Sequence, residues 1–171
     1  MNDELLDFTG QVILITGGST GIGRATALAF AKRGAKVVVG DVSEEGQKTI
    51  ELIKAAGGEG LYVKTNVADA AQVRALVDTT VKTYGGLHCA FNNAGILPPT
   101  LPLAEQDEEM YDRVMAVDVK GVFLCLKYQI RHMLKAGGGV IVNTASVAGV
   151  IADPGMAPYV AAKHAVIGLT K

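Results

Sequence analysis

Hydrophobic and polar positions divide this chain into two kinds of segment. Short runs that are apolar at nearly every position, rich in Val, Ile and Leu, are separated by longer segments in which apolar residues recur at helical spacing. Strands without a polar face are typical of sheets that are covered on both sides. The apolar runs therefore predict buried strands at 11–17, 36–41, 60–66, 87–95 and 139–146.

The segments of helical period lie between and after these strands. They predict helices at 20–33, 43–56, 69–84, 107–135 and 155–170. Glycines typical of helix ends follow four of them, and Ser43 and Asp69 are candidate N-caps. Alternating strands and helices predict an α/β fold: a Rossmann-type, doubly wound parallel sheet with right-handed crossovers. Because no repeat or linker interrupts the pattern, we expect residues 1–171 to form a single domain.

Composition excludes several classes of function. The 171 residues are 49% hydrophobic and 19% charged, with a net charge of −1, so nothing favours nucleic acid or an anionic membrane as a partner. No apolar run approaches the roughly 20 residues of a membrane span, and the N-terminal "MNDELLDF" lacks the features of a signal peptide. Cys89 and Cys125 stand in apolar stretches, which favours reduced, buried thiols in a cytoplasmic protein.

The turn between the first strand and the first helix reads "ITGGSTGIGR", with glycines in the spacing G-x-x-x-G-x-G. Gly17 would permit a tight turn, Gly21 a close approach of the backbone to a pyrophosphate, and Gly23 close packing of helix on strand. The helix N-terminus would add free N–H groups and a positive dipole end. This turn predicts a dinucleotide site.

Asp41 ends the second predicted strand, eighteen residues after Gly23. A carboxylate there can accept hydrogen bonds from the ribose hydroxyls of adenosine and repels a 2′-phosphate. No Arg or Lys stands at 18–20 or 42–43. The sequence therefore favours NAD over NADP. The alternative is a solvated loop acid, or one that assists the N-cap at Ser43.

Tyr159 and Lys163 are one helical turn apart, and Ser146 lies thirteen residues before the tyrosine. Oxidation of a secondary alcohol needs a base for the hydroxyl proton. A free tyrosine has a pKa of about 10, so such a base needs a depression of roughly three units, which a lysine and an oxidised nicotinamide can favour. Ser146 could hold the substrate oxygen. Each residue alone has an ordinary alternative: half-buried aromatic, surface lysine, turn serine.

Together with "NNAG" at 92–95, these motifs make the chain resemble the short-chain dehydrogenase/reductase family from about Gly10 to Lys171. The resemblance implies an oxidoreductase that transfers a hydride between a secondary alcohol or ketone and a nicotinamide cofactor. It implies that Tyr159 is the acid/base, that Ser146 orients the substrate, that Lys163 also binds the nicotinamide ribose, and that Asn93 ties neighbouring strands. The residues it implies for cofactor binding are Gly17, Ser19, Thr20, Gly21, Ile22, Gly23, Asp41, Asn66, Val67, Asn92, Ala94, Gly95, Tyr159 and Lys163.

Two positions depart from the family pattern. Asn66 stands where aspartate is commoner, and its amide oxygen could still meet the adenine amino group. Asp118 stands where the family usually has a catalytic asparagine, whose main-chain carbonyl serves in a proton relay. We expect that the Asp118 carboxylate adds negative charge near Lys163 and that activity is retained but altered.

Family members continue past the Tyr/Lys helix with a strand, a substrate lid and a final strand. We therefore expect a sheet that lacks the family's last two strands and lid, in a fragment or an unusually short member, and a homo-oligomer, dimer or tetramer, formed through the late helices. The near wall of the substrate pocket, Ile96 to Pro98 and 147–156, is mostly apolar, which suggests a small or cyclic substrate.

Two other functions remain open. One is a catalytically idle NAD-binding or assembly module, which the missing region and Asp118 motivate. The other is an NADP-linked ketoacyl-type reductase, against which Asp41 argues. His88, His132 and His164 show no metal-ligand spacing, so no metal is expected.

Overall fold

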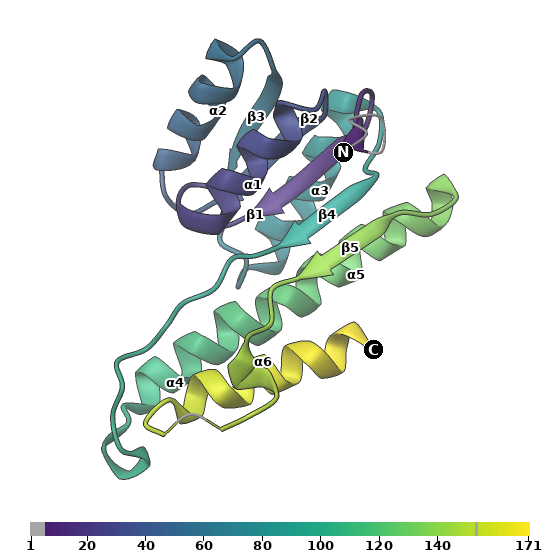
Figure 1. Ribbon diagram of the computed structural model, residues 1–171. Coiled ribbons are helices and arrows are strands. Elements are labelled where there is room, and N and C mark those ends of the chain that lie inside the picture. The colour runs from purple at the N-terminus through teal and green to yellow at the C-terminus, as the bar shows by residue number, and fades with distance from the viewer. Residues whose placement is uncertain (1–5, 153) are drawn as a thin grey trace.

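The computed structural model describes residues 6–152 and 154–171. The first five residues, which belong to the stretch used in the signal-peptide argument, and position 153 in the expected pocket wall lie outside the described residues. Five parallel strands form one sheet in the order β3-β2-β1-β4-β5 (Figure 1). Their bounds are β1 Val12–Thr16, β2 Lys36–Asp41, β3 Glu59–Lys64, β4 Cys89–Asn92 and β5 Val140–Asn143. The predicted parallel α/β fold is confirmed.

The helices follow the predicted segments closely. They are α1 Gly21–Ala31, α2 Glu45–Ala55, α3 Ala70–Tyr84, α4 Glu108–Val114, α5 Gly121–Ala136 and α6 Ala157–Thr170. Two short 3₁₀ turns, η2 Leu103–Glu105 and η4 Val147–Gly149, were not predicted. The predicted helix 107–135 is interrupted by a π-helical turn, η3 Met115–Lys120, between α4 and α5. Such turns often accompany functional sites, and this one carries Asp118.

The alternation of side chains along each strand decides which helices cover it. Ile13 and Ile15 of β1 pack with Val37 and Val39 of β2 toward α1 and α2. Leu14, between them, packs on the opposite face toward α3 and α5. Figure 1 shows the same two layers, with α1 in front of the sheet and α3 behind it. Both faces of β1 and β2 are therefore buried, as their continuous apolar character requires.

The helix ends use the expected chemistry with one exception. Asp69 caps α3, and its Oδ1 accepts hydrogen bonds from the backbone N–H groups of Ala71 and Gln72 at 2.8 and 3.1 Å. The prediction of Ser43 as an N-cap was wrong by one residue, because α2 begins after Glu44. Ser43 Oγ still accepts from the backbone N–H of Glu45 at 3.3 Å.

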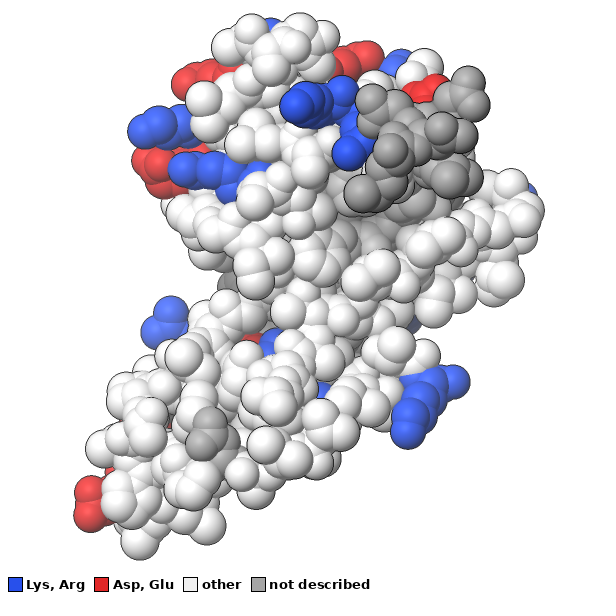
Figure 2. All heavy atoms as spheres, in the orientation of Figure 1, with Lys and Arg blue, Asp and Glu red and all other residues white. Residues whose placement is uncertain are grey.

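Charge is distributed unevenly over the face that Figure 2 shows. Lys, Arg, Asp and Glu gather over α1 and α2, whereas the surface over β5 and α6 is largely uncharged in this view (Figure 2). Two valines of β5, Val140 and Val142, are 60% and 54% exposed. Over residues 6–152 and 154–171, no helix is both long and apolar enough to cross a membrane.

Candidate active site

The strand order reverses between β1 and β4, and a cavity of about 700 Å³ opens around this point. In open α/β sheets, ligands bind at the carboxyl ends of the strands where the order reverses. Asp41 and Arg113 are the charged side chains of its lining. The lining comprises Gly17, Thr20, Gly21, Ile22, Gly40, Asp41, Val42, Thr65, Asn66, Val67, Ala68, Asn93, Ala94, Gly95, Ile96, Arg113, Ala116 and Val117.

The glycine turn is shaped by close backbone approaches. Gly17 has φ +68°, and a Cβ at this position would lie 2.8 Å from the Cα of Ala94. A Cβ at Gly23 would collide with the carbonyl oxygen of Gly17. Gly21 has φ +51°, and a methyl group at this position would meet open space, so its backbone conformation alone favours glycine. At Gly17 and Gly21 the turn thus presents backbone, and no side chain, to the cavity.

Asp41 is fixed at the cavity wall by two backbone donors. Its Oδ2 accepts from Ser19 N–H and its Oδ1 from Ser43 N–H, both at 3.0 Å. The side chain therefore does assist the start of the α2 region, and its position in the lining also leaves it available to a ligand. A carboxylate has about four acceptor sites, so two remain.

Five residues expected at the cofactor are absent from the lining. Tyr159 and Lys163 lie on α6, and the other three lie behind the lining. Ser19 and Gly23 are buried beneath the turn. Asn92 is 2% exposed, and its side chain points to α5, where it exchanges hydrogen bonds with Gln129 at 3.0 and 2.7 Å. The Asn92 amide also donates to Asn143 of β5 at 2.9 Å. Its side chain joins strands and helix, away from this cavity.

Asn93 and Asn66 hold loops at the cavity edge. The Asn93 side chain donates to the carbonyls of Thr16 and Gly17 at 3.2 Å and accepts from Thr144, which ties β1, β4 and the segment after β5 together. The Asn66 Oδ1 accepts from Ala68 N–H at 3.0 Å. One acceptor site of the Asn66 oxygen is therefore used within the loop, and a second remains for a ligand.

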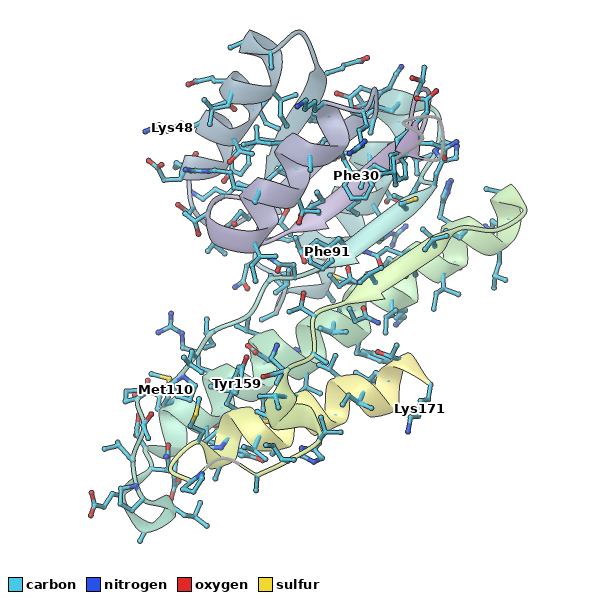
Figure 3. All side chains as sticks on the ribbon, viewed as in Figure 1. Phe30, Lys48, Phe91, Met110, Tyr159 and Lys171 are labelled. Atoms are coloured by element: carbon cyan, nitrogen blue, oxygen red, sulfur yellow. The ribbon has the colours of Figure 1, made fainter. Side chains whose placement is uncertain are left out.

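Lys163 and Asp118 form a buried ion pair. Their side chains are 4% and 0% exposed, and Lys163 Nζ lies 3.1 Å from Asp118 Oδ2. This oxygen makes no hydrogen bond of good geometry, so the contact is an ion pair, whereas Nζ donates a hydrogen bond to the Thr144 carbonyl at 3.1 Å. The Tyr159 ring centroid lies 5.3 Å from Nζ. Figure 3 places Tyr159 where α6 passes the consecutive elements α4, η3 and α5.

Asp118 also links this cluster to the cavity. Its Oδ1 accepts from the backbone N–H of Ile96 at 2.8 Å, and Ile96 is part of the lining. Burial raises the pKa of Asp118 above its ordinary value, while the Ile96 N–H and the Lys163 ammonium oppose that rise.

Ser146 begins the turn η4 and is partly buried. Its Oγ accepts from Ala148 N–H at 3.2 Å, which leaves its O–H free to donate. Ser146 lies two residues after Thr144, whose carbonyl holds Lys163.

Sequence reasoning missed several residues of this region. Arg113, Ala116 and Val117 reach the cavity only because α4 and η3 pass over the ends of the strands, which no local pattern reveals. Gln129 is fully buried on α5. A lone glutamine inside an otherwise apolar helix stripe was the available signal for it.

Comparisons with known proteins agree on one family. The model of the short chain dehydrogenase family matches residues 11–171. An uncharacterized oxidoreductase of Thermotoga maritima is 49% identical over 97% of this chain and 65% of its own length. A cyclohexanol dehydrogenase of Acinetobacter sp. is 46% identical over 96% of this chain and 66% of its length.

Solved structures agree as well. The crystal structure of an NAD⁺-bound xylitol dehydrogenase matches with a TM-score of 0.93 and 36% identity, over 95% of this chain and 63% of that one. This chain thus spans about two thirds of the length of the relatives it matches.

Proposed function

Because this chain belongs to the short-chain dehydrogenase family, we propose that it is an NAD-dependent oxidoreductase that interconverts a secondary alcohol and a ketone. The observation that carries this proposal is the position of the buried Asp118–Lys163 pair. It lies beside Tyr159 and is joined through Ile96 to the cavity at the strand reversal. A general base, a cation and a cofactor-sized cavity are what hydride removal from an alcohol requires.

The residues present fit a dinucleotide. The close approaches at Gly17 and Gly23 leave no room for side chains at the turn, and Gly21 and Ile22, at the start of α1, line the cavity. Phosphate groups are favoured at such a helix N-terminus. When bound, the oxidised nicotinamide supplies the acceptor for the hydride.

The chain's own groups would handle the proton. Tyr159 takes the hydroxyl proton of the alcohol, and the Lys163 ammonium favours the ionised phenol. Ser146, with its O–H free to donate, holds the substrate oxygen as charge develops on it. In the reductive direction Tyr159 returns the proton to the carbonyl oxygen.

NAD, and not NADP, is the proposed cofactor because of Asp41. Two backbone donors hold its carboxylate at the cavity wall, where it would accept from ribose hydroxyls and repel a 2′-phosphate. Arg113 is the cation of the lining and lies on a different element, α4.

Cyclic secondary alcohols are the proposed substrate class. The relatives include a cyclohexanol dehydrogenase, and the segment expected to form the near pocket wall is mostly apolar and exposes Leu97, Val147 and Val150 at 64%, 66% and 71%. An apolar wall of this kind suits a ring that carries few polar groups.

The test is turnover. Purified protein is incubated with NAD⁺ and a panel of cyclic secondary alcohols, cyclohexanol first, and NADH formation is followed by absorbance. Tyr159→Phe should lower kcat/KM by about 10²–10⁴-fold, the usual worth of a general base. Tyr111→Phe, which removes the same hydroxyl from an exposed tyrosine of α4, is the matched control. Equal turnover by wild type and Tyr159→Phe contradicts the mechanism, and cofactor binding without turnover across the panel favours an idle binding module.

The domain organisation and the oligomeric state are also part of the proposal. We propose that residues 1–171 belong to one domain, since the five strands form a single sheet, and that the protein is a homo-oligomer. Phe123, Ile130 and Leu134 are 48%, 43% and 77% exposed, and their spacing places them along one side of α5. Light scattering of wild type and Ile130→Glu tests this: the variant should have the lower mass.

A further inference from the structure

We propose that Asp118 is a positioning residue of the active site: its carboxylate fixes the Lys163 ammonium in place and moderates the positive charge that Lys163 presents to Tyr159. This inference rests on the proposed function for its kinetic consequence. The ion pair itself can be tested without turnover, as described below. Asp118 is distinct from the groups that would touch the reacting atoms, because it acts through Lys163.

The two oxygens of Asp118 bind different partners. Oδ1 accepts from Ile96 N–H at 2.8 Å, and Oδ2 faces Lys163 Nζ at 3.1 Å. One carboxylate thereby connects the loop after β4 with α6, from its own position in η3. Lys163 Nζ has three N–H donors, of which the Thr144 carbonyl takes one and Asp118 occupies a second direction. One donor remains for a ligand.

This geometry suits aspartate better than asparagine. An asparagine that accepted the Ile96 hydrogen bond through its oxygen would turn its NH₂ group toward Nζ. Both groups are donors only, so the contact would lose its attraction. A buried ammonium without an opposite charge is costly, and the carboxylate supplies that charge within 3.1 Å.

Few other charges reach the pair. From α6, Tyr159 lies one turn before Lys163, and His164 points away and bonds to the Val160 carbonyl. The segment after β5 contacts Lys163 only through the uncharged backbone carbonyl of Thr144. The turn η4, Val147–Gly149, has no titratable side chain. The cation of the cavity lining, Arg113, comes from α4, and Lys120 of η3 is exposed. Asp118 is therefore the dominant counter-charge of Lys163.

The consequence is a shift in the pH dependence of catalysis. An ammonium near Tyr159 favours the ionised phenol, and a carboxylate beside that ammonium offsets part of its effect. Removal of the carboxylate should let the base act at lower pH. A neighbouring charge moves a titration by about 1–3 units. Because the carboxylate acts through the ammonium and offsets only part of its effect, we expect a shift of about one pH unit, at the lower end of that range.

The experiment compares pH profiles of kcat/KM for alcohol oxidation. The rising limb of Asp118→Asn should lie about one pH unit below that of wild type. Asp78→Asn, the same change at an exposed site on α3, should coincide with wild type. An unchanged limb, a limb at higher pH, or loss of turnover by a folded Asp118→Asn protein overturns the proposal.

A second measurement is made on the wild-type protein and is independent of activity. In the ¹H–¹⁵N spectrum of wild-type lysine side chains at neutral pH, the buried pair predicts a Lys163 ammonium signal that exchanges slowly with water. Its loss in Lys163→Arg assigns it. If wild type gives no such protected signal, the ion pair is wrong. If the signal is present and no alcohol is oxidised, the proposed function fails while the pair stands.

Discussion

The strands β1 and β5 are both short apolar runs in one parallel sheet, yet they are used differently. All five residues of β1 are 1% exposed or less, whereas Val140 and Val142 of β5 are more than half exposed. β1 carries the glycine turn of the proposed cofactor site, and β5 leads to Thr144 and Ser146. The cofactor half of the site is thus attached to a closed apolar core, and the catalytic half to a strand with one open face.

Side-chain hydrogen bonds connect β5 and the end of β4 to the helices α5 and α6. Asn92 and Gln129 exchange two hydrogen bonds, Asn92 donates to Asn143, and Asn143 donates to Thr170 of α6. The Lys163–Asp118 pair adds a further tie between α6 and η3. Position in this half is therefore set by specific hydrogen bonds and charges, which fix geometry more sharply than apolar contact does.

The largest expected effect comes from the apolar core of β1. Leu14→Ala should lower the free energy of unfolding by about 2–5 kcal/mol, because it removes a fully buried side chain and leaves a cavity. Val142→Ala, a truncation on the open face of β5, should change it by about 0.5 kcal/mol or less. Urea unfolding of both variants checks this. Similar losses would mean that the two strands are equally buried in solution.

A smaller loss is expected from the amide network. Gln129→Ala leaves the Asn92 side chain short of a donor and an acceptor in a buried site, so unfolding should become easier by about 1–3 kcal/mol. Gln47→Ala removes an exposed glutamine of α2 and serves as the control in the same urea titrations. If the two variants are equally stable, the network contributes nothing to holding β5.

The buried carboxylate predicts a dependence of stability on pH. Burial raises the pKa of Asp118 in the folded state, so its contribution is most favourable below the unfolded value near 3.8 and declines as the pH rises through the folded pKa. Relative to Asp118→Asn, wild type should therefore lose stability between pH 4 and pH 7. Urea midpoints of both proteins at the two pH values provide the measurement, and a difference that stays constant would contradict the raised pKa.

The smallest expected effect is a difference in the rate at which a thiol reagent modifies the two cysteines. Burial raises the pKa of Cys125, on α5, to about 12, and Cys89, on β4, is only partly buried. At pH 8 a thiol reagent should modify Cys89 first and leave Cys125 unreacted until urea is added. Mass spectrometry of the peptides distinguishes the two sites. Equal native rates would show that the α5 side opens readily.

The fold could be predicted from sequence because its strands are covered on both faces. The predicted strand 36–41, with its unbroken apolar run at 37–39 after Gly34, is typical of a strand buried between two helical layers. The glycines after the helices marked the helix ends. The π-helical turn could not be predicted, since it arises where η3 packs against α6 and no local residue pattern requires it.

The candidate site could be predicted in part, because its motifs lie at the ends of the predicted strands. "NNAG" correctly indicated the end of β4, but side chains alternate along a strand, so Asn92 shares the α3/α5 face with Ala90 and turns to Gln129. If this alternation had been applied to β4, the sequence would have predicted that the Asn92 side chain points away from the cavity. The family resemblance predicted the Asp118 carboxylate near Lys163, but no local pattern does, because the two residues are 45 positions apart in the sequence.

The proposed function depends most on the cavity at the strand reversal accepting NAD through the glycine turn and Asp41. Isothermal titration of the protein with NAD⁺ and with NADP⁺ tests this directly. We predict that NAD⁺ binds at least about tenfold more tightly, and that Asp41→Ala narrows the gap, since a hydrogen bond to a charged group contributes about 1.5–3 kcal/mol. Binding of NADP⁺ as tight as that of NAD⁺, or no binding of either, would contradict it.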